Sequence, residues 1–130
     1  MKKLLIAAAV ALITTPALAS DPVLGMWRSA PDDNGNTGHI SVTSCGAKIC
    51  GKLVKSFDKK GKETPSANIG KNIIWDMVSR GDGYYDSGKI WSPDRDKTYK
   101  SKMQLTGSKL KIKGCIAFIC RDGGTWKRVN

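Results

Sequence analysis

The chain has 130 residues, a formal net charge of +11 and four cysteines. This length fits a single domain with a modest core. Almost all of the excess charge is lysine, a hydrated point charge, whereas arginine is the residue that reads phosphates in a bidentate manner. We therefore expect no nucleic-acid partner, and no segment beyond the N-terminal region is apolar enough to span a membrane.

Residues 1–19 have the pattern of a secretory signal peptide. Two lysines follow Met1, the apolar stretch 4–13 is too short to span a bilayer, and Ala17-Leu18-Ala19 is a small-x-small cleavage site. Cleavage there removes two lysines and no acidic residue, so the net charge falls from +11 to +9. We expect residues 20–130 to form one domain that is located in the periplasm or secreted.

The rest of the sequence shows short runs of alternating apolar and polar residues, separated by Gly, Asp, Asn and Pro. A period of two is typical of antiparallel strands with one buried face. Strands are expected at 24–29, 37–44, 49–57, 72–79, 84–91, 99–105, 109–113 and 125–129, with the lysine-rich segment 58–68 as the longest loop. About eight strands in series predict an all-β fold, a small antiparallel up-and-down barrel that leaves no free edge.

The four cysteines form two pairs of equal spacing. An oxidising compartment favours disulfides, and zinc is the alternative, although a C-x4-C spacing is wider than that of most zinc ligands. Of the three possible connectivities we favour the local pairs, Cys45 with Cys50 and Cys115 with Cys120, because each pair brackets a segment that can reverse the chain. Each bridge should contribute about 2 kcal/mol. We expect no metal and no cofactor.

Two motifs near the ends of the domain resemble the lipocalin and calycin signature. Gly25-Met26-Trp27 resembles its G-x-W motif, and Trp126-Lys127-Arg128 resembles the closing strand, whose arginine covers that tryptophan. Further segments, including 45–54, 88–94 and 110–114, are similar to a group of small exported bacterial proteins catalogued as a domain of unknown function in this superfamily. The resemblance implies a lipocalin-like barrel and no established activity.

An eight-stranded barrel is either filled by side chains or wide enough to hold one small ligand. Small residues on the inward faces would make room for a ligand or allow the large indoles to fit. Because so small a domain contains four tryptophans, a filled or narrowly open barrel is favoured over a roomy cup. The candidates for closing the barrel or contacting a ligand are Trp27, Tyr99, Met103, Trp126 and Arg128.

Five lysines would share the outer face of one hairpin if the alternation holds. They are Lys100, Lys102, Lys109, Lys111 and Lys113. Like charges on adjacent strands repel, so such a patch lowers stability unless something neutralises it. A well-hydrated outer face is the favoured interpretation, because no aromatic residue is interleaved to stack a base or a sugar. An anionic envelope surface or an envelope protein is the alternative.

Residues suited to catalysis are few. His39 is the only histidine, and Glu63, the only glutamate, lies in the expected loop. The aspartates at 32–33 and 94–96 lack the spacing of a calcium loop and are interpreted as turn residues. We therefore predict a non-enzymatic binding module for a small apolar or amphipathic ligand. Two alternatives stay open: a cell-envelope interaction protein that uses the lysines, and an enzyme, which would require His39 to be buried beside an acid.

Overall fold

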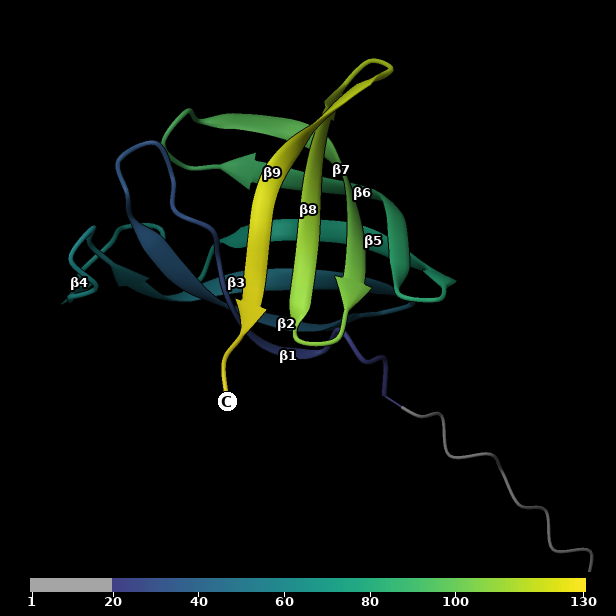
Figure 1. The fold of residues 1–130 in the computed structure, drawn as a ribbon, viewed down its shortest axis with the longest axis horizontal. Coiled ribbons are helices and arrows are strands. Elements are labelled where there is room, and N and C mark those ends of the chain that lie inside the picture. Colours follow the sequence, from purple (N-terminus) through teal and green to yellow (C-terminus); the bar gives the residue numbers. More distant parts are fainter. Residues whose placement is uncertain (1–19) are drawn as a thin grey trace, which may run out of the picture.

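The computed structural model describes residues 20–130, so the predicted signal peptide lies outside the described residues. This part of the chain consists of strands joined by turns and loops (Figure 1). The strands are β1 (Gly25–Arg28), β2 (Thr37–Cys45), β3 (Lys48–Phe57), β4 (Glu63–Thr64), β5 (Asn72–Gly81), β6 (Tyr84–Ser92), β7 (Lys97–Thr106), β8 (Lys109–Ile116) and β9 (Ile119–Arg128). Between residues 20 and 130 there is no helix with the length and apolar character needed to cross a membrane.

Eight of these strands close into an antiparallel barrel, which confirms the predicted fold class. The strands follow the order β2-β1-β9-β8-β7-β6-β5-β3, and the pairing of β2 with β3 closes the ring. The additional strand β4 pairs only with the end of β3, where Ser56 lies opposite Thr64 and Phe57 opposite Glu63. β4 falls inside the segment 58–68 that was expected to be a loop, because two residues are too few to produce an alternating pattern.

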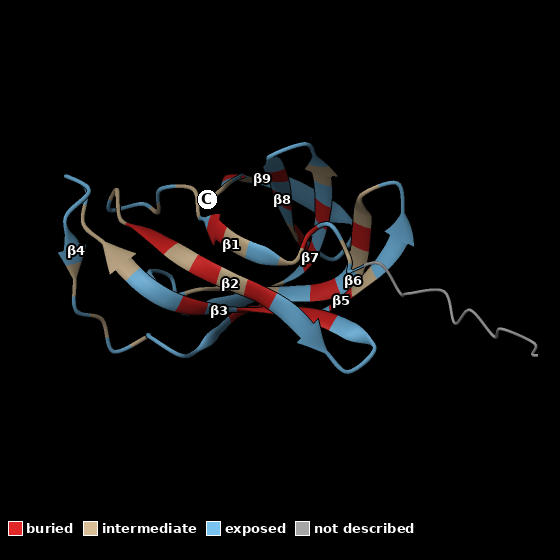
Figure 2. Cartoon of the chain, turned by 90° about the horizontal axis from the view of Figure 1, so that it is seen from below, coloured by how far each residue is buried: buried red, intermediate tan, exposed pale blue. Residues whose placement is uncertain are grey.

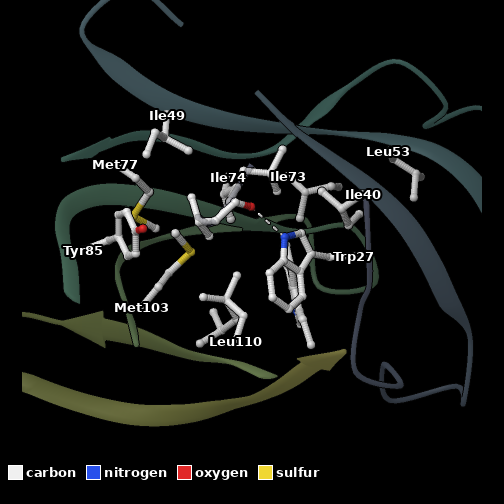
Figure 3. Packing of buried hydrophobic residues seen from close by; sticks show 14 residues of the cluster. Trp27, Ile40, Ile49, Leu53, Ile73, Ile74, Met77, Tyr85, Met103 and Leu110 are labelled. Atoms are coloured by element: carbon white, nitrogen blue, oxygen red, sulfur yellow. Dashed lines mark hydrogen bonds between the residues drawn. The ribbon is translucent and has the colours of Figure 1, made fainter. Parts of the chain in front are cut away.

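Side chains fill one half of the barrel. Buried and partly exposed residues alternate along the first half of β2, as expected for a strand with one face on the core (Figure 2). The packed half contains Trp27, Ile74, Met77, Tyr85 and Met103, all at most 1% exposed. Figure 3 shows these side chains gathered between the strands. They lie toward the end of the barrel that carries the β2–β3, β5–β6 and β7–β8 turns, and they close that end.

Both local disulfides are confirmed. Cys45–Cys50 joins β2 to β3, and Cys115–Cys120 joins β8 to β9. Successive turns of an up-and-down barrel alternate between its two ends. The first bridge therefore lies at the closed end, and the second lies at the opposite end, beside the β1–β2 and β6–β7 connections.

Candidate ligand-binding site

The end of the barrel opposite the packed half opens into a cup of about 910 Å³. Its wall is apolar and includes Ile40, Ile73, Ile90, Ile112 and Trp126. Its rim is polar, because the β1–β2, β3–β5 and β6–β7 connections bring Asp, Asn, Ser and Arg side chains to the mouth. Pockets that bind small molecules typically measure roughly 300–1,000 Å³ and combine an apolar lining with a few polar groups. The cup has both properties.

Of the four tryptophans, Trp75 lies away from the interior and Trp91 lies in the wall of the cup, which leaves the cup open. Trp27 and Trp126 are buried, at 0% and 3% exposure. Trp75 and Trp91 are partly exposed and line a shallow groove on the outer surface, where the ammonium of Lys71 lies 5.4 Å from the centroid of the Trp91 ring. Trp91 also lines the cup and packs against the core. The expectation of a filled or narrowly open barrel therefore holds only for the packed half.

One polar group in the cup wall has no partner. Thr37 lines the cup, and its hydroxyl is buried without a hydrogen bond to any of residues 20–130. Another buried hydroxyl, that of Ser101, donates to the carbonyl of Lys113 at 2.8 Å. Burying a polar group without a partner costs about 1–3 kcal/mol. A ligand atom that hydrogen-bonds to Thr37 would recover part of this free energy.

A charged contact, here called the mouth latch, crosses the opening of the cup. It consists of Asp33, Asp94 and Arg95. The Arg95 guanidinium donates to both carboxylate oxygens of Asp33, at 2.9 and 3.0 Å, and the Asp33 N–H donates to the Asp94 carboxylate at 3.1 Å. These residues lie in the β1–β2 and β6–β7 connections, which join strands on opposite sides of the barrel. The two connections nevertheless lie side by side at the mouth (Figure 1).

Two groups of the mouth latch, Arg95 and Asp94, have pKa values that favour their charged forms. The hydrogen bond to Asp33 raises the pKa of Arg95 further above its high ordinary value. Partial burial opposes ionisation of Asp94, but hydrogen bonds from the Ser92 hydroxyl and the Asp33 N–H bring the pKa of Asp94 below its ordinary value. The Arg95 and Asp33 side chains are 54% and 59% exposed, and ion pairs between such exposed side chains contribute little to stability. The mouth latch is therefore a weak contact between the two connections that carry it.

The opposite end of the barrel is closed by Arg128 over Trp27. The guanidinium carbon of Arg128 lies 4.1 Å from the centroid of the Trp27 ring. Arg128 also donates to the carbonyls of Leu24, at 2.8 Å, and Pro22, at 2.5 Å. The Trp27 indole N–H donates to the Val23 carbonyl at 2.8 Å, shown dashed in Figure 3. One side chain of β9 thus holds the N-terminal segment against the barrel.

The five residues predicted to close the barrel or contact a ligand lie at three levels. Tyr99 and Trp126 line the cup. Trp27 and Met103 are in the packed half, and Arg128 covers the closed end. The structure therefore brings only two of the five to the surface that a ligand would contact.

The five predicted lysines lie on the outside of the β7–β8 hairpin, and we call them the lysine face. Lys102 is opposite Lys113 in the strand register, and Lys100, Lys109 and Lys111 are exposed on the same two strands. None of the five forms an ion pair with any of the described residues. Their positive charge is therefore available to an anionic surface.

His39 lies outside the cup, with its ring centroid 4.6 Å from that of Phe57. Partial burial lowers the pKa of His39 below its ordinary value, and the charges of Lys55 and Arg28 lower it further, against a weaker opposing effect of Glu63. The imidazole is therefore neutral at neutral pH, and it has no hydrogen-bonded acid among the described residues. Within residues 20–130, no group of three His, Cys, Asp or Glu side chains is arranged to hold a metal ion. The arrangement does not supply what the enzymatic alternative required.

Comparison with known proteins agrees with this architecture. Residues 25–128 match a family described as "Uncharacterized protein conserved in bacteria (DUF2147)". The chain belongs to this DUF2147 family. It is also similar to a solved structure described as "Protein HP1028 from the human pathogen Helicobacter pylori belongs to the lipocalin family", with 15% identity, a TM-score of 0.65 and coverage of 82% of each chain. This likeness confirms the lipocalin-like fold. No curated protein sequence matches the chain.

The match to the DUF2147 family begins and ends at two residues that meet in space, Gly25 and Arg128. Gly25 has a φ of 128°, and a Cβ at this position would lie 2.9 Å from a guanidinium nitrogen of Arg128. Only glycine combines this backbone conformation with so close an approach. The glycine of the G-x-W motif therefore makes room for the arginine that covers Trp27.

Proposed function

We propose that this DUF2147 protein is an exported, non-enzymatic carrier that binds one small apolar or amphipathic molecule in the cup. The observation that carries the proposal is the cup, which combines about 910 Å³ of space with an apolar wall and a polar rim. Binding would be driven by burial of apolar surface, at about 25 cal/mol per Å². The few polar groups would fix the orientation of the ligand.

The lining supports a ligand with one apolar and one polar end. Its apolar part would pack on Ile40, Ile112 and Trp126 in the wall. Its polar end would meet the unpartnered hydroxyl of Thr37 or the rim, where Arg121 lines the mouth. A uniformly polar molecule would leave the wall without apolar contacts.

The two disulfides support the exported setting. Disulfides persist in the periplasm and outside the cell, whereas thiols stay reduced in the cytosol. The closure of both hairpins by cystine is compatible with the signal peptide predicted for residues 1–19. A periplasmic location is therefore part of the proposal.

A cup-filling variant tests the proposal. Gly114 lines the cup, its φ is outside the left-handed region, and a Cβ there would lie 3.6 Å from Tyr99, an ordinary contact distance. Gly114→Leu should therefore fold and occupy part of the cup. The probe is anilinonaphthalene sulfonate, an apolar dye with one anionic group, titrated by fluorescence. We expect saturable binding to the wild type and about tenfold weaker binding, or more, to the variant.

The matched control is Lys111→Leu, which adds the same side chain to the outward face of the same strand. It should bind the dye as the wild type does. The absence of saturable binding to the wild type would contradict the proposal. Equal affinity of Gly114→Leu and the wild type would show that the dye binds elsewhere, and this too would count against the cup.

A further inference from the structure

The β8–β9 hairpin ends in an exposed apolar tip, residues Ile116, Ala117, Phe118 and Ile119. Three of these residues are large and exposed: Ile116 at 69%, Phe118 at 103% and Ile119 at 66%. Figure 1 shows this hairpin projecting beyond the neighbouring strands. A cluster of large apolar residues that the rest of the described chain leaves in solvent marks a contact site.

The apolar tip is pre-organised. Ile116 pairs with Ile119 across the turn, and the Cys115–Cys120 disulfide joins the two strands at the next position. Because the chain is already ordered and cross-linked there, contact with a partner would cost little conformational entropy. The hairpin therefore presents its apolar residues in a fixed arrangement at one end of the barrel.

Cationic side chains surround the base of the apolar tip. Lys100 and Arg121 lie beside the disulfide in the strand register, and Lys113 lies two residues before it. All three are exposed. The segment also contains one acidic residue, Asp122, which is opposite Lys113, so the three cations outnumber the carboxylate. The lysine face continues the positive charge away from the tip, and the chain without residues 1–19 carries a net charge of +9.

We infer that the apolar tip inserts into the surface of an anionic phospholipid bilayer, while Lys100, Lys113 and Arg121 contact the lipid headgroups. With a strand rise of about 3.3 Å per residue, Lys113 lies about 13 Å below the end of the turn. An interfacial element buries its apolar side about 5–10 Å into the boundary between headgroups and acyl chains, so these cations reach headgroup level. Apolar insertion and basic charge together give stable binding where one alone is weak.

The arrangement of charge favours a bilayer over a protein surface as the occupant. The apolar tip, with Lys100, Lys113 and Arg121 at its base, matches an acyl layer bordered by phosphates, and the lysine face has no ion-pair partner among the described residues. The inference does not rest on the cup's ligand, because insertion requires only the apolar tip and its neighbouring charges. It does place the mouth of the cup near the lipid, since Ile116 and Ile119 also line it.

Vesicle flotation of the mature chain, residues 20–130, tests the inference. We expect the wild type to bind phosphatidylcholine vesicles that contain phosphatidylglycerol, to bind vesicles of phosphatidylcholine alone far less, and to bind less as salt is added. Phe118→Asp should lower the partition coefficient about tenfold or more, because a charge replaces an apolar side chain that would leave water. Phe118 is fully exposed, so the variant should keep the wild-type melting temperature.

The matched control is Ala47→Asp, which makes the same change of charge in the turn of the other disulfide-closed hairpin, at the opposite end of the barrel. It should bind as the wild type does. No binding of the wild type to the anionic vesicles overturns the inference and leaves a protein as the occupant of the tip. Equal binding of Phe118→Asp and the wild type, or an equal loss with Ala47→Asp, overturns insertion, because net charge alone would then explain the result.

Discussion

Replacing Arg128 by alanine should lower the free energy of unfolding by about 3.5 kcal/mol. The side chain donates hydrogen bonds to the Leu24 and Pro22 carbonyls and lies over the Trp27 ring. A hydrogen bond from a charged donor contributes about 1.5–3 kcal/mol, and a cation–π contact at a partly exposed site contributes about 0.5–1 kcal/mol. Because Arg128 is partly exposed, we take the lower end of each range.

Thermal unfolding followed by circular dichroism measures this loss. For a domain of this size a change of 1 kcal/mol shifts the melting temperature by about 4 °C, so Arg128→Ala should melt about 14 °C lower than the wild type. Its tryptophan emission should also shift to the red, since Trp27 loses its cover. Lys127→Ala, at the exposed neighbouring position, is the control and should change stability by at most about 0.5 kcal/mol. An unchanged melt for Arg128→Ala would refute the reasoning that this arginine closes the barrel.

Three other outcomes are expected. Gly88→Ala should lower the free energy of unfolding in urea by about 1–3 kcal/mol, because the new Cβ would clash with the Met77 side chain; an unchanged midpoint would contradict this packing. Asp33→Ala should speed dissociation of the dye from the cup in stopped-flow experiments, since its ion pair with Arg95 crosses the mouth; equal rates would count against the mouth latch. The lowered pKa of Asp94 means that its carboxylate stabilises the fold above the ordinary aspartate value of 3.8 and loses this effect as the pH falls below it. Asp94→Asn should therefore lose less melting temperature on acidification than the wild type, and parallel curves would disprove the assignment.

The barrel strands could be predicted because each one buries alternate residues against a core. In β7, Ser101 and Met103 are buried and Tyr99 is partly buried, while the lysines between them are exposed. The same periodicity placed the lysine face on the outside. The local disulfides could also be predicted, because each cysteine pair brackets a tight turn.

The open cup could not be predicted, because it depends on which way the Trp75 indole of β5 points. The register between β3 and β5 is irregular near Gly51, and Ile73 and Ile74 are both buried although they are adjacent. This irregularity breaks the period of two just before Trp75, which lies on the outer groove. The number of tryptophans in the sequence therefore overestimates the volume of the barrel interior that their side chains fill.

The polar parts of the site depend on contacts between distant segments. Asp33 and Arg95 are separated by 62 residues and meet only because two connections converge over the mouth. Thr37 falls on the inward face of a predicted strand, but its missing hydrogen-bond partner is a property of the folded wall. The sequence predicts that the chain reverses at the apolar tip. A run of apolar residues does not by itself indicate that their side chains stay exposed.

The measurement that tests the carrier account most directly is native mass spectrometry, followed by solvent extraction, of the mature protein purified from a periplasm. The expected result is one bound apolar or amphipathic molecule per chain, which extraction releases and which Gly114→Leu retains less well than Lys111→Leu. A mass equal to that of the polypeptide alone, for both the wild type and the Lys111→Leu control, would contradict the account.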